Sequence, residues 1–438
     1  MKNKVNNRLD QLYARITNEE DARICKEISD DACRFVPVNF FLQVISKTFT
    51  KLGDALSSPK TVLAWLMSYV NAPVALIGFL VPIRESGSML PQIFIAGYIR
   101  KLPVRKWVFV IGSLLQFAAI AGIGAVSLLF TGATAGWLIL ALLVVFSLSR
   151  GLCSVASKDV LGKTIPKTRR GRMGGVATSV SGVMALGAGL YMFIKTQQEL
   201  AVDFYAYLVF FAASMWILGA VAYAMIREYP GETSGGANAI REALARLSLL
   251  RDNKQFRNFV ISRSLLLCSA LTAPFYVVIA QDMLGKDVKI LGLFILANGV
   301  ATSISAPFWG RLADLSSKRV MVIAALITAG LGIVMFAVVS WLPVLHEQTW
   351  VYPLAFFILG VAHSGVRLGR KTYIVDMAGG NKRTDYVAVS NTVIGMVLLL
   401  TGGISAMASM ISPAGIILIL SLFGLAGAVT SHRLPSVE

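Results

Sequence analysis

The sequence predicts an all-α membrane protein with twelve transmembrane helices arranged as two homologous six-helix halves. The chain has 438 residues, of which 56% are hydrophobic and only 15% are charged, with a mean hydropathy of +0.69. A soluble protein carries about 25% charged residues. Apolar runs of about 20 residues, the length that spans a bilayer, recur along the chain, and the two halves of the sequence match at one fixed offset.

Each predicted span is long enough to cross a bilayer as a helix. A helix rises 1.5 Å per residue, so about 20 residues cross a hydrocarbon core about 30 Å thick. The first run is the least regular, because Lys47, Lys51 and Asp54 interrupt it. The predicted spans are 38–66, 73–99, 107–131, 137–158, 173–194, 204–226, 257–281, 288–310, 320–342, 350–371, 386–410 and 413–431.

Polar segments divide these spans into five predicted regions. A cytoplasmic amphipathic segment at 1–37 precedes the N-terminal six-helix half at 38–226. A cytoplasmic linker at 227–256 leads to the C-terminal six-helix half at 257–432, which a short cytoplasmic tail at 433–438 follows.

The distribution of charge predicts the orientation of the chain in the membrane. A net charge of +18 would suggest a nucleic-acid partner in a soluble protein, but here the basic residues gather in alternate loops. The loops at 100–106, 163–172 and 318–319 are basic, whereas the loop at 131–136 contains no Lys or Arg. By the positive-inside rule the basic loops and both termini are cytoplasmic. We expect a monomeric, multi-pass protein of the bacterial inner (plasma) membrane, whose partners are membrane lipids and a small solute rather than nucleic acid.

An internal repeat relates the two halves at an offset of 213 residues, with no gap from the second span through the fifth. The segments GYIRKLPVRK (97–106) and GRLADLSSKR (310–319) both follow a span and open a basic loop. Two such halves in parallel orientation are typical of secondary transporters. Further matches at this offset pair Trp137 with Trp350, Lys158 with Lys371, Arg170 with Arg383, Val176 with Val389 and Gly182 with Gly395.

The two repeated loops resemble the G-x-L-A-D-x-x-G-[RK]-[RK] motif of the major facilitator superfamily. The second copy has Ser317 where the family has its later Gly, and the first has Lys101 for the Asp and Val104 for the later Gly. The resemblance covers residues 38–432 and implies the major facilitator fold and solute transport. It also implies that the loop latches the halves on the cytoplasmic side, with its Asp capping a helix end or pairing with basic residues. The predicted cytoplasmic gate residues are Gly97, Arg105, Lys106, Gly310, Asp314, Lys318 and Arg319.

Two other stretches bear on the kind of transporter. ESGSMLPQ (85–92) and the stretch at 367–392 look like a bacterial permease group of this superfamily, whose substrate is unknown. The Gly-Pro signature that the family's drug–proton antiporters carry in the fifth span is missing from SGVMALGAGLYM (181–192).

Charged residues within the spans are concentrated in the first, second, fourth, seventh and tenth. A charge at mid-membrane costs about 2.5–3.5 kcal/mol on insertion scales, so such residues usually face a bundle interior or an aqueous cavity. The family resemblance implies that spans one, four, seven and ten line a central cavity, and the charge pattern agrees with this. The predicted substrate-binding residues are Arg84, Glu85, Arg150, Arg263, Arg367, Lys47 and His363.

Several of these charges also have a structural interpretation. Lys47, Lys51 and Asp54 recur at three- and four-residue steps on one helix face, which fits either a cavity wall or a local ion-pair ladder. His363 fits either a packed imidazole or a hydrogen-bond donor to the cavity. Three further basic residues near helix ends could extend to lipid headgroups or contact the solute: Lys158, Arg370 and Lys371.

Arg84 and Glu85 lie near the middle of the second predicted span. Adjacent residues on a helix point about 100° apart, so the two cannot neutralise each other on one face. We therefore expect separate partners, with Asp54 for Arg84 and Lys47 or Lys51 for Glu85. Glu85 is the predicted proton-coupling residue, although a role as a structural brace for Arg84 fits the sequence equally well.

These observations predict a secondary transporter that works by alternating access and moves a small, anionic or zwitterionic organic solute, with proton coupling as an option. Guanidinium groups suit carboxylate and phosphate recognition. One alternative is efflux of drugs or amphiphiles, and another is a membrane sensor or scaffold without transport. No Ser-His-Asp or metal-ligand pattern is present in the sequence, so we predict no catalytic residues, no metal, no cofactor and no enzymatic activity.

Overall fold

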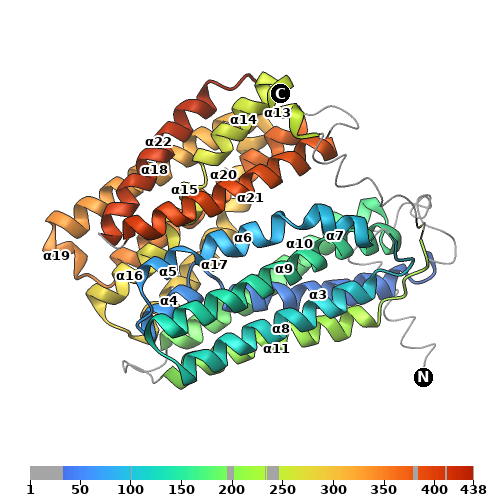
Figure 1. The fold of residues 1–438 in the computed structure, drawn as a ribbon, viewed down its shortest axis with the longest axis horizontal. Helices are drawn as coiled ribbons and strands as arrows, with labels where there is room; N and C mark the ends of the chain where they lie inside the picture. The colour runs from blue at the N-terminus through green and yellow to red at the C-terminus, as the bar shows by residue number, and fades with distance from the viewer. Residues whose placement is uncertain are drawn as a thin grey trace.

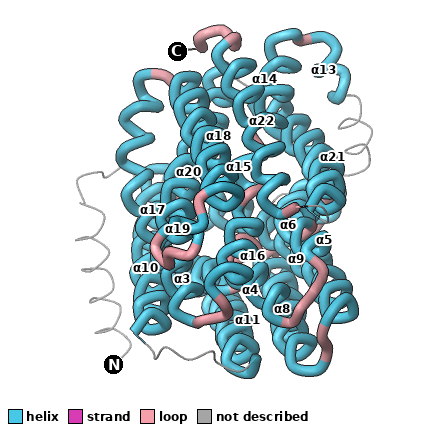
Figure 2. The backbone as a smooth tube through the Cα atoms, turned by 90° about the vertical axis from the view of Figure 1, so that its left-hand side faces the viewer, coloured by secondary structure: helices cyan, strands magenta, loops and turns pink. Residues whose placement is uncertain are grey.

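A computed structural model describes residues 33–99, 101–194, 202–231, 233, 246–377, 383–409 and 412–437. In this part of the chain every regular element is a helix, and Figure 2 shows the backbone as a bundle of helices joined by short loops. The all-α prediction is therefore confirmed. Residues 1–32 of the predicted N-terminal segment, and residues 234–245 of the predicted linker, lie outside the described residues.

The N-terminal half has six membrane crossings, and it forms the blue and green half of Figure 1. Its first crossing consists of two helices and its second of three, whereas the other four are single helices. The helices are Val36–Leu56 (α3) and Val62–Tyr69 (α4), then Val74–Gly78 (α5), Leu80–Met89 (α6) and Gln92–Ile99 (α7), then Lys106–Leu129 (α8), Gly132–Thr164 (α9), Lys167–Ile194 (α10) and Val202–Ala224 (α11).

The C-terminal half repeats this arrangement, with three helices in its first crossing. These three are Lys254–Leu265 (α14), Cys268–Leu271 (α15) and Ala273–Leu284 (α16). The other crossings are Val288–Leu315 (α17), Ser317–Trp341 (α18), Val351–Met377 (α20), Arg383–Ser409 (α21) and Pro413–His432 (α22), and the short elements Arg246–Ser248 (η1), Leu249–Asp252 (α13) and Pro343–His346 (α19) lie between crossings. Helices α9 and α20 are the fourth crossings of the two halves, as the repeat predicts.

Among the described residues, ten helical segments are long and apolar enough to cross a membrane, with Lys254–Leu284 taken as one. The remaining two crossings are the first and the second, which are divided into shorter helices. Together they make the twelve crossings that the sequence predicts.

The first crossing breaks at residues 57–61, where the sequence cannot continue as a helix. Pro59 has no backbone N–H and disfavours the helical conformation of the residue before it. The carbonyl oxygen of Ser58 accepts from the N–H groups of Thr61 and Leu63, at 3.3 and 3.0 Å, so the interrupted backbone keeps local partners. The prediction of an uninterrupted span at 38–66 is therefore wrong. The equivalent crossing of the second half breaks between α14 and α15 and again at Thr272.

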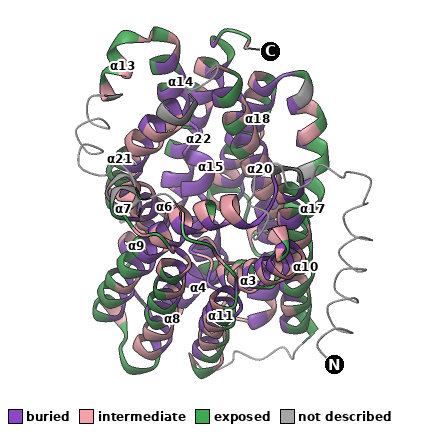
Figure 3. Ribbon diagram, turned by 90° about the vertical axis from the view of Figure 1, so that its right-hand side faces the viewer, coloured by how far each residue is buried: buried purple, intermediate pink, exposed green. Residues whose placement is uncertain are grey.

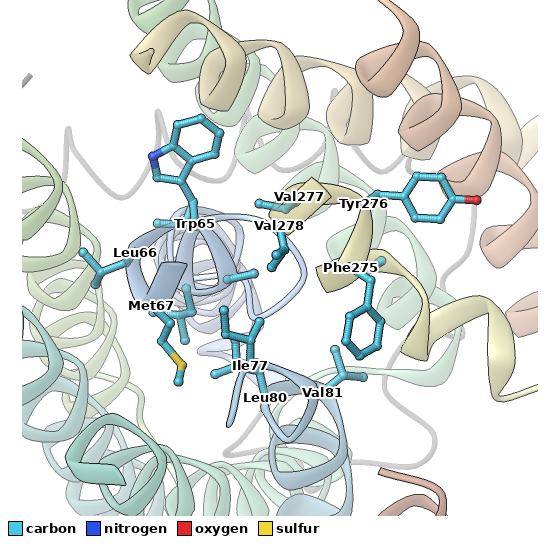
Figure 4. Packing of buried hydrophobic residues seen from close by; sticks show 14 of the residues in the cluster. Trp65, Leu66, Met67, Ile77, Leu80, Val81, Phe275, Tyr276, Val277 and Val278 are labelled. Carbon is cyan, nitrogen blue, oxygen red and sulfur yellow. The ribbon is translucent and has the colours of Figure 1, made fainter. Parts of the chain in front are cut away.

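The two halves share a hydrophobic core at one end of the molecule, which we call the closed end. In Figure 4, side chains from α4, α5 and α6 pack against side chains from α16, and they form one buried cluster. The labelled residues are Trp65, Leu66, Met67, Ile77, Leu80, Val81, Phe275, Tyr276, Val277 and Val278. Exposing one such side chain to water would cost about 1.5–3 kcal/mol, so this packing opposes separation of the halves here.

Hydrogen bonds reinforce the closed end from one half to the other. The side-chain amide of Gln281 donates to the carbonyl oxygen of Trp65 at 3.2 Å. The ammonium group of Lys286 donates to the carbonyl oxygen of Tyr69 at 3.0 Å and to Oδ1 of Asn71 at 3.1 Å. The Tyr205 hydroxyl in turn donates to the carbonyl oxygen of Lys286 at 3.0 Å.

At the opposite end, which we call the basic end because it carries residues 101–106 and the Lys318–Arg319 turn, the halves keep separate cores. One cluster around Phe256 and Tyr373 belongs to the C-terminal half, and another around Phe109 belongs to the N-terminal half. In the described part of the chain, neither cluster contains residues of both halves. Figure 1 accordingly shows the halves diverging from α4, α5 and α16 toward α3 and α14.

The outer faces of the helices carry large apolar side chains, as contact with lipid requires. Trp107, Leu129 and Val334 are each more than half exposed. Figure 3, viewed toward the basic end, shows exposed residues on the outer faces of many helices and buried residues between them.

The contact between α10 and α17 also joins the two halves, and it depends on glycine. A Cβ atom at Gly292 of α17 would lie 2.9 Å from the carbonyl oxygen of Gly189 and 2.9 Å from the backbone nitrogen of Phe193, both on α10. Neither backbone atom can move without moving the helix. Gly292 therefore permits the close approach of the two helices.

We expect Gly292→Ala to lower the melting temperature of the purified protein, because the added methyl group forces α10 and α17 apart. Overpacking of this kind costs about 1–3 kcal/mol. The matched control is Gly187→Ala on α10, where a Cβ atom would meet nothing within 4 Å. Equal melting temperatures for the two variants would contradict the close contact.

Candidate functional site

A cavity of about 230 Å³ lies between the two halves, on the basic-end side of the shared core. Its walls come from the first, second and fourth crossings of one half and the equivalent first, second and fourth of the other. The lining residues are Asp54, Ser58, Pro59, Lys60, Arg84, Glu85, Arg150, Ser269, Ala273, Asn298, Thr302, Phe356, Leu359, Gly360, His363, Ser364 and Arg367.

One carboxylate oxygen organises the N-terminal wall of this cavity. Oδ1 of Asp54, on α3, accepts from Nη2 of Arg84 at 2.7 Å and from Nη1 of Arg150 at 2.6 Å. Arg84 belongs to α6 and Arg150 to α9, so this one oxygen connects three crossings. The pairing of Arg84 with Asp54 that the sequence predicts is confirmed.

The two arginines differ in their exposure. The side chain of Arg84 is 6% exposed, and its guanidinium group lies 4.9 Å from the centre of the Phe146 ring. The side chain of Arg150 is 37% exposed. Among the described residues Asp54 is its hydrogen-bond partner through one nitrogen, which leaves donors on the other nitrogens for a solute.

Glu85 also lines the cavity, on a different face of α6 from Arg84. The cations that act on its carboxylate are Arg150, Arg84, Lys60 and Arg370. The expected partner Lys51 donates instead to the Thr178 hydroxyl, so that part of the prediction is wrong.

A hydrogen-bonded chain crosses the cavity between the halves. Nζ of Lys60 lies 2.9 Å from Nε2 of His363, and Nδ1 of His363 lies 3.1 Å from the hydroxyl of Ser269. Lys60 belongs to the break of the first crossing, His363 to α20 and Ser269 to α15. His363 therefore contacts a residue of the opposite half and faces the cavity.

The lining of the cavity is positively charged overall. Its ionised side chains are four cations, Lys60, Arg84, Arg150 and Arg367, against the two carboxylates of Asp54 and Glu85. With His363 neutral, this leaves an excess of two positive charges. Arg367 is exposed, so it adds its charge to the open part of the cavity.

Two predicted substrate-binding residues, Arg263 and Lys47, are described but are not part of the cavity lining. Arg263 is 7% exposed and donates to the Ser390 hydroxyl at 2.6 Å and to Oδ1 of Asn391 at 2.9 Å. It therefore ties α14 to α21 within the C-terminal half. Lys47 is half-buried on α3, farther toward the basic end.

The first copy of the repeated loop is bound within the N-terminal half. The carboxylate of Glu228 is fully buried and accepts from the backbone N–H groups of Arg105 and Lys106, at 2.9 and 2.7 Å. Glu228 thus caps the start of α8, where a negative charge is favourable. The Arg105 guanidinium pairs with Asp159 of α9, and Nζ of Lys163 pairs with both acids, at 3.0 Å from Asp159 and 3.1 Å from Glu228.

The second copy is bound within the C-terminal half. Lys318 donates to the carbonyl oxygen of Leu434 at 2.8 Å, and the Arg319 N–H group lies 3.3 Å from the Ser316 hydroxyl. Gly97 lies in α7 and Gly310 in α17, in the C-terminal part of each helix. The backbone of Asp314 belongs to α17, but its side chain lies outside the described residues. The hydrogen bonds of Arg105, Lys106, Lys318 and Arg319 described here therefore each join residues of the same half.

The family model of the Major Facilitator Superfamily matches residues 50–397 and 264–435. The chain belongs to this superfamily. It is accordingly a multi-pass membrane protein and a secondary transporter, as the sequence predicts. No curated protein matches the sequence.

Solved structures agree with the superfamily fold over nearly the whole chain. A D-xylose–proton symporter superposes with a TM-score of 0.67 at 15% identity, covering 92% of this chain and 98% of that one. The nucleoside transporter NupG gives a TM-score of 0.63 at 14% identity, with 90% and 99% covered. The inward open conformation of the xylose transporter XylE from E. coli gives 0.63 at 12%, with 92% and 97% covered. At these identities the similarity shows the fold alone.

Sequence reasoning missed three charged residues that the structure places in polar networks: Lys60, Asp159 and Glu228. Lys60 lies in a run that reads as one continuous apolar helix, although the Ser-Ser-Pro before it signals a break. Asp159 and Lys163 are four residues apart on one helix, a spacing that indicates an ion pair. Glu228 follows the sixth crossing and has no local signal that it would cap α8.

We expect Asp54→Asn to lower the melting temperature markedly, because the buried guanidinium of Arg84 loses its counter-charge. The cost is about 1–3 kcal/mol, below that of a fully buried pair because Asp54 retains some exposure. Asp203→Asn on α11 is the control, since Asp203 is exposed. Thermal unfolding of both variants in detergent tests this, and an unchanged melting temperature for Asp54→Asn would contradict the role of the shared oxygen.

Proposed function

We propose that the protein carries a small organic anion or zwitterion across the bacterial inner membrane by alternating access. The observation that supports this most directly is the exposed guanidinium of Arg150, which lines a cavity with two excess positive charges. Arg367 supplies a second cation from the opposite half. A carboxylate or phosphate between them would satisfy donors from both halves at once.

The size of the cavity favours a small solute. Pockets for drug-sized ligands usually measure about 300–1,000 Å³, whereas this cavity measures about 230 Å³. Polar groups other than the cations, such as Asn298 and Ser364, also line it. A metabolite with one or two acidic groups fits this size and polarity.

The proposed cycle follows from the unequal ends of the molecule. The closed end holds a shared core and cross-half hydrogen bonds, whereas the cores of the basic end are separate. By the positive-inside rule the basic end faces the cytoplasm, so this arrangement corresponds to an inward-facing state. The two halves would rock about the central cavity to reach the outward-facing state.

The test is a thermal-shift screen against anionic metabolites, followed by counterflow in proteoliposomes for each stabilising compound. We expect Arg150→Gln to reduce counterflow at least tenfold, because a neutral amide cannot pair with the solute's acidic group. Arg170→Gln at the basic end is the control, since its guanidinium donates to the carbonyl oxygens of Ile165 and Gly162. Anion counterflow that persists in Arg150→Gln would contradict the proposal.

Glu85 is the residue that we propose for proton coupling. It lines the cavity beside four cations, and the structure gives its carboxylate no ion pair within the described residues. A carboxylate in that position can accept a proton from cavity water in one state and release it in another.

We expect Glu85→Gln to abolish proton-driven accumulation of the solute while leaving solute exchange intact, because the amide binds no transferable proton. The measurement compares uptake under an imposed pH gradient with counterflow at equal pH. If Glu85 only braces Arg84, accumulation and exchange will fall together and the melting temperature will drop.

Export of amphiphiles remains the second candidate, and one observation favours it. An apolar crevice of about 330 Å³ lies between α6, α9 and α21, lined by residues that include Leu90, Leu148 and Leu399. Leu148 and Leu399 are exposed on the outer surface, so an acyl chain could occupy the crevice from the bilayer. Transport of hydrophobic dyes but not of anionic metabolites in the same proteoliposomes would favour this function.

A further inference from the structure

We propose that Lys60 and His363 form a latch between the two halves, and that the acidic group of a bound solute releases this latch by replacing His363 as the partner of Lys60. The inference rests on the proposed transport of an anion or zwitterion. It assigns to Lys60 a role in coupling solute binding to the opening of the closed end.

The chemistry of the latch determines where its protons lie. A lysine ammonium group can only donate, so Nε2 of His363 must accept from Lys60. The imidazole is then neutral, with its proton on Nδ1, and donates to the Ser269 hydroxyl. The Ser269 hydroxyl donates in turn to the carbonyl oxygen of Leu266 at 3.1 Å.

This chain of hydrogen bonds connects the two helix breaks that face each other across the cavity. Lys60 lies in the break between α3 and α4, and Leu266 lies in the break between α14 and α15. The first break leads into α4, and the second leads into α15 and then α16. Helices α4 and α16 pack together at the closed end. The latch therefore joins the two helix breaks that lead into the helices of the closed-end core.

An anion is well suited to open this latch. In the Lys60–His363 hydrogen bond only the lysine is charged. In a bond between Lys60 and a carboxylate or phosphate both partners are charged, and such hydrogen bonds are stronger. Lys60 lines the same cavity as Arg150, so one solute can contact both. Arg84 and Arg367 line this cavity as well, and their positive charges favour an anion beside Lys60.

The test uses a cysteine reporter in the closed-end core. Val277 is fully buried there, so in the Val277→Cys protein the new thiol should react slowly with maleimide. We expect Lys60→Gln, in the same protein, to raise the labelling rate at least fivefold without any solute, because the latch is lost. His363→Ala should do the same, whereas Lys60→Arg, which can still donate to His363, should keep labelling slow.

Matched controls separate this effect from general loosening of the fold. Lys47→Gln removes a lysine of α3 that does not belong to the described cavity lining, and it should label as slowly as the parent protein. Chain lacking Val277→Cys reports any reaction of the native cysteines. Labelling of Lys60→Gln and His363→Ala at the parent rate would overturn the latch.

The second arm tests release by an anion, with succinate, glutamate and inorganic phosphate as probes. The probe that gives the largest Arg150-dependent rise in melting temperature should speed labelling of the parent protein, but should add nothing in Lys60→Gln. Labelling that is unaffected by this probe in the parent would overturn release by the solute while leaving anion binding intact. If none of the probes, nor any anion in the wider screen, stabilises the protein through Arg150, the proposed function itself is contradicted.

Discussion

The structure depends on ion pairs between charged side chains within the membrane-spanning helices, where an unpaired charge is costly. Oδ1 of Asp54 accepts from both Arg84 and Arg150, so one acid offsets two cations on three different crossings. Arg84 is almost fully buried, and its guanidinium carbon lies over the ring of Phe146. An unpaired guanidinium in that position would cost several kcal/mol. The pairing therefore fixes how α3, α6 and α9 face one another, and with them the N-terminal wall of the cavity.

The same need for pairing explains why the two ends of the molecule differ. At the closed end, apolar side chains from α4 and α16 pack together, and the side chains of Gln281 and Lys286 donate hydrogen bonds across the halves. At the basic end several charged groups of the repeated loops have partners within their own half. Glu228 and Asp159 satisfy Arg105 and Lys163, and Lys318 bonds to the C-terminal segment. These pairs form within one half, so they do not depend on contact between the halves.

Much of this architecture could be predicted from the sequence, because it follows from regularities that any helix must obey. Hydropathy located the crossings, and the 213-residue offset related α9 to α20. The pairing of Arg84 with Asp54 was also predictable, since adjacent helix residues diverge and acidic residues are scarce within the spans. The surroundings of Glu85 were not, because the break at 57–61 places Lys60 among the cations near it. Arg263 was misplaced for a different reason: its partners Ser390 and Asn391 are neutral, so no charge pattern identified the helix that it contacts.

The break in the first crossing determines where charged groups of the cavity lie. A continuous helix over 38–66 would pair its own backbone N–H and C=O groups, and the helical repeat alone would set the direction of Lys60. The Ser-Ser-Pro sequence instead ends α3 at Leu56 and leaves backbone groups that must find other partners, which membranes tolerate only beside a cavity or within protein. The break lines the cavity, and it places the ammonium group of Lys60 beside His363. In this way a local rule about proline determines which charged groups from the two halves meet.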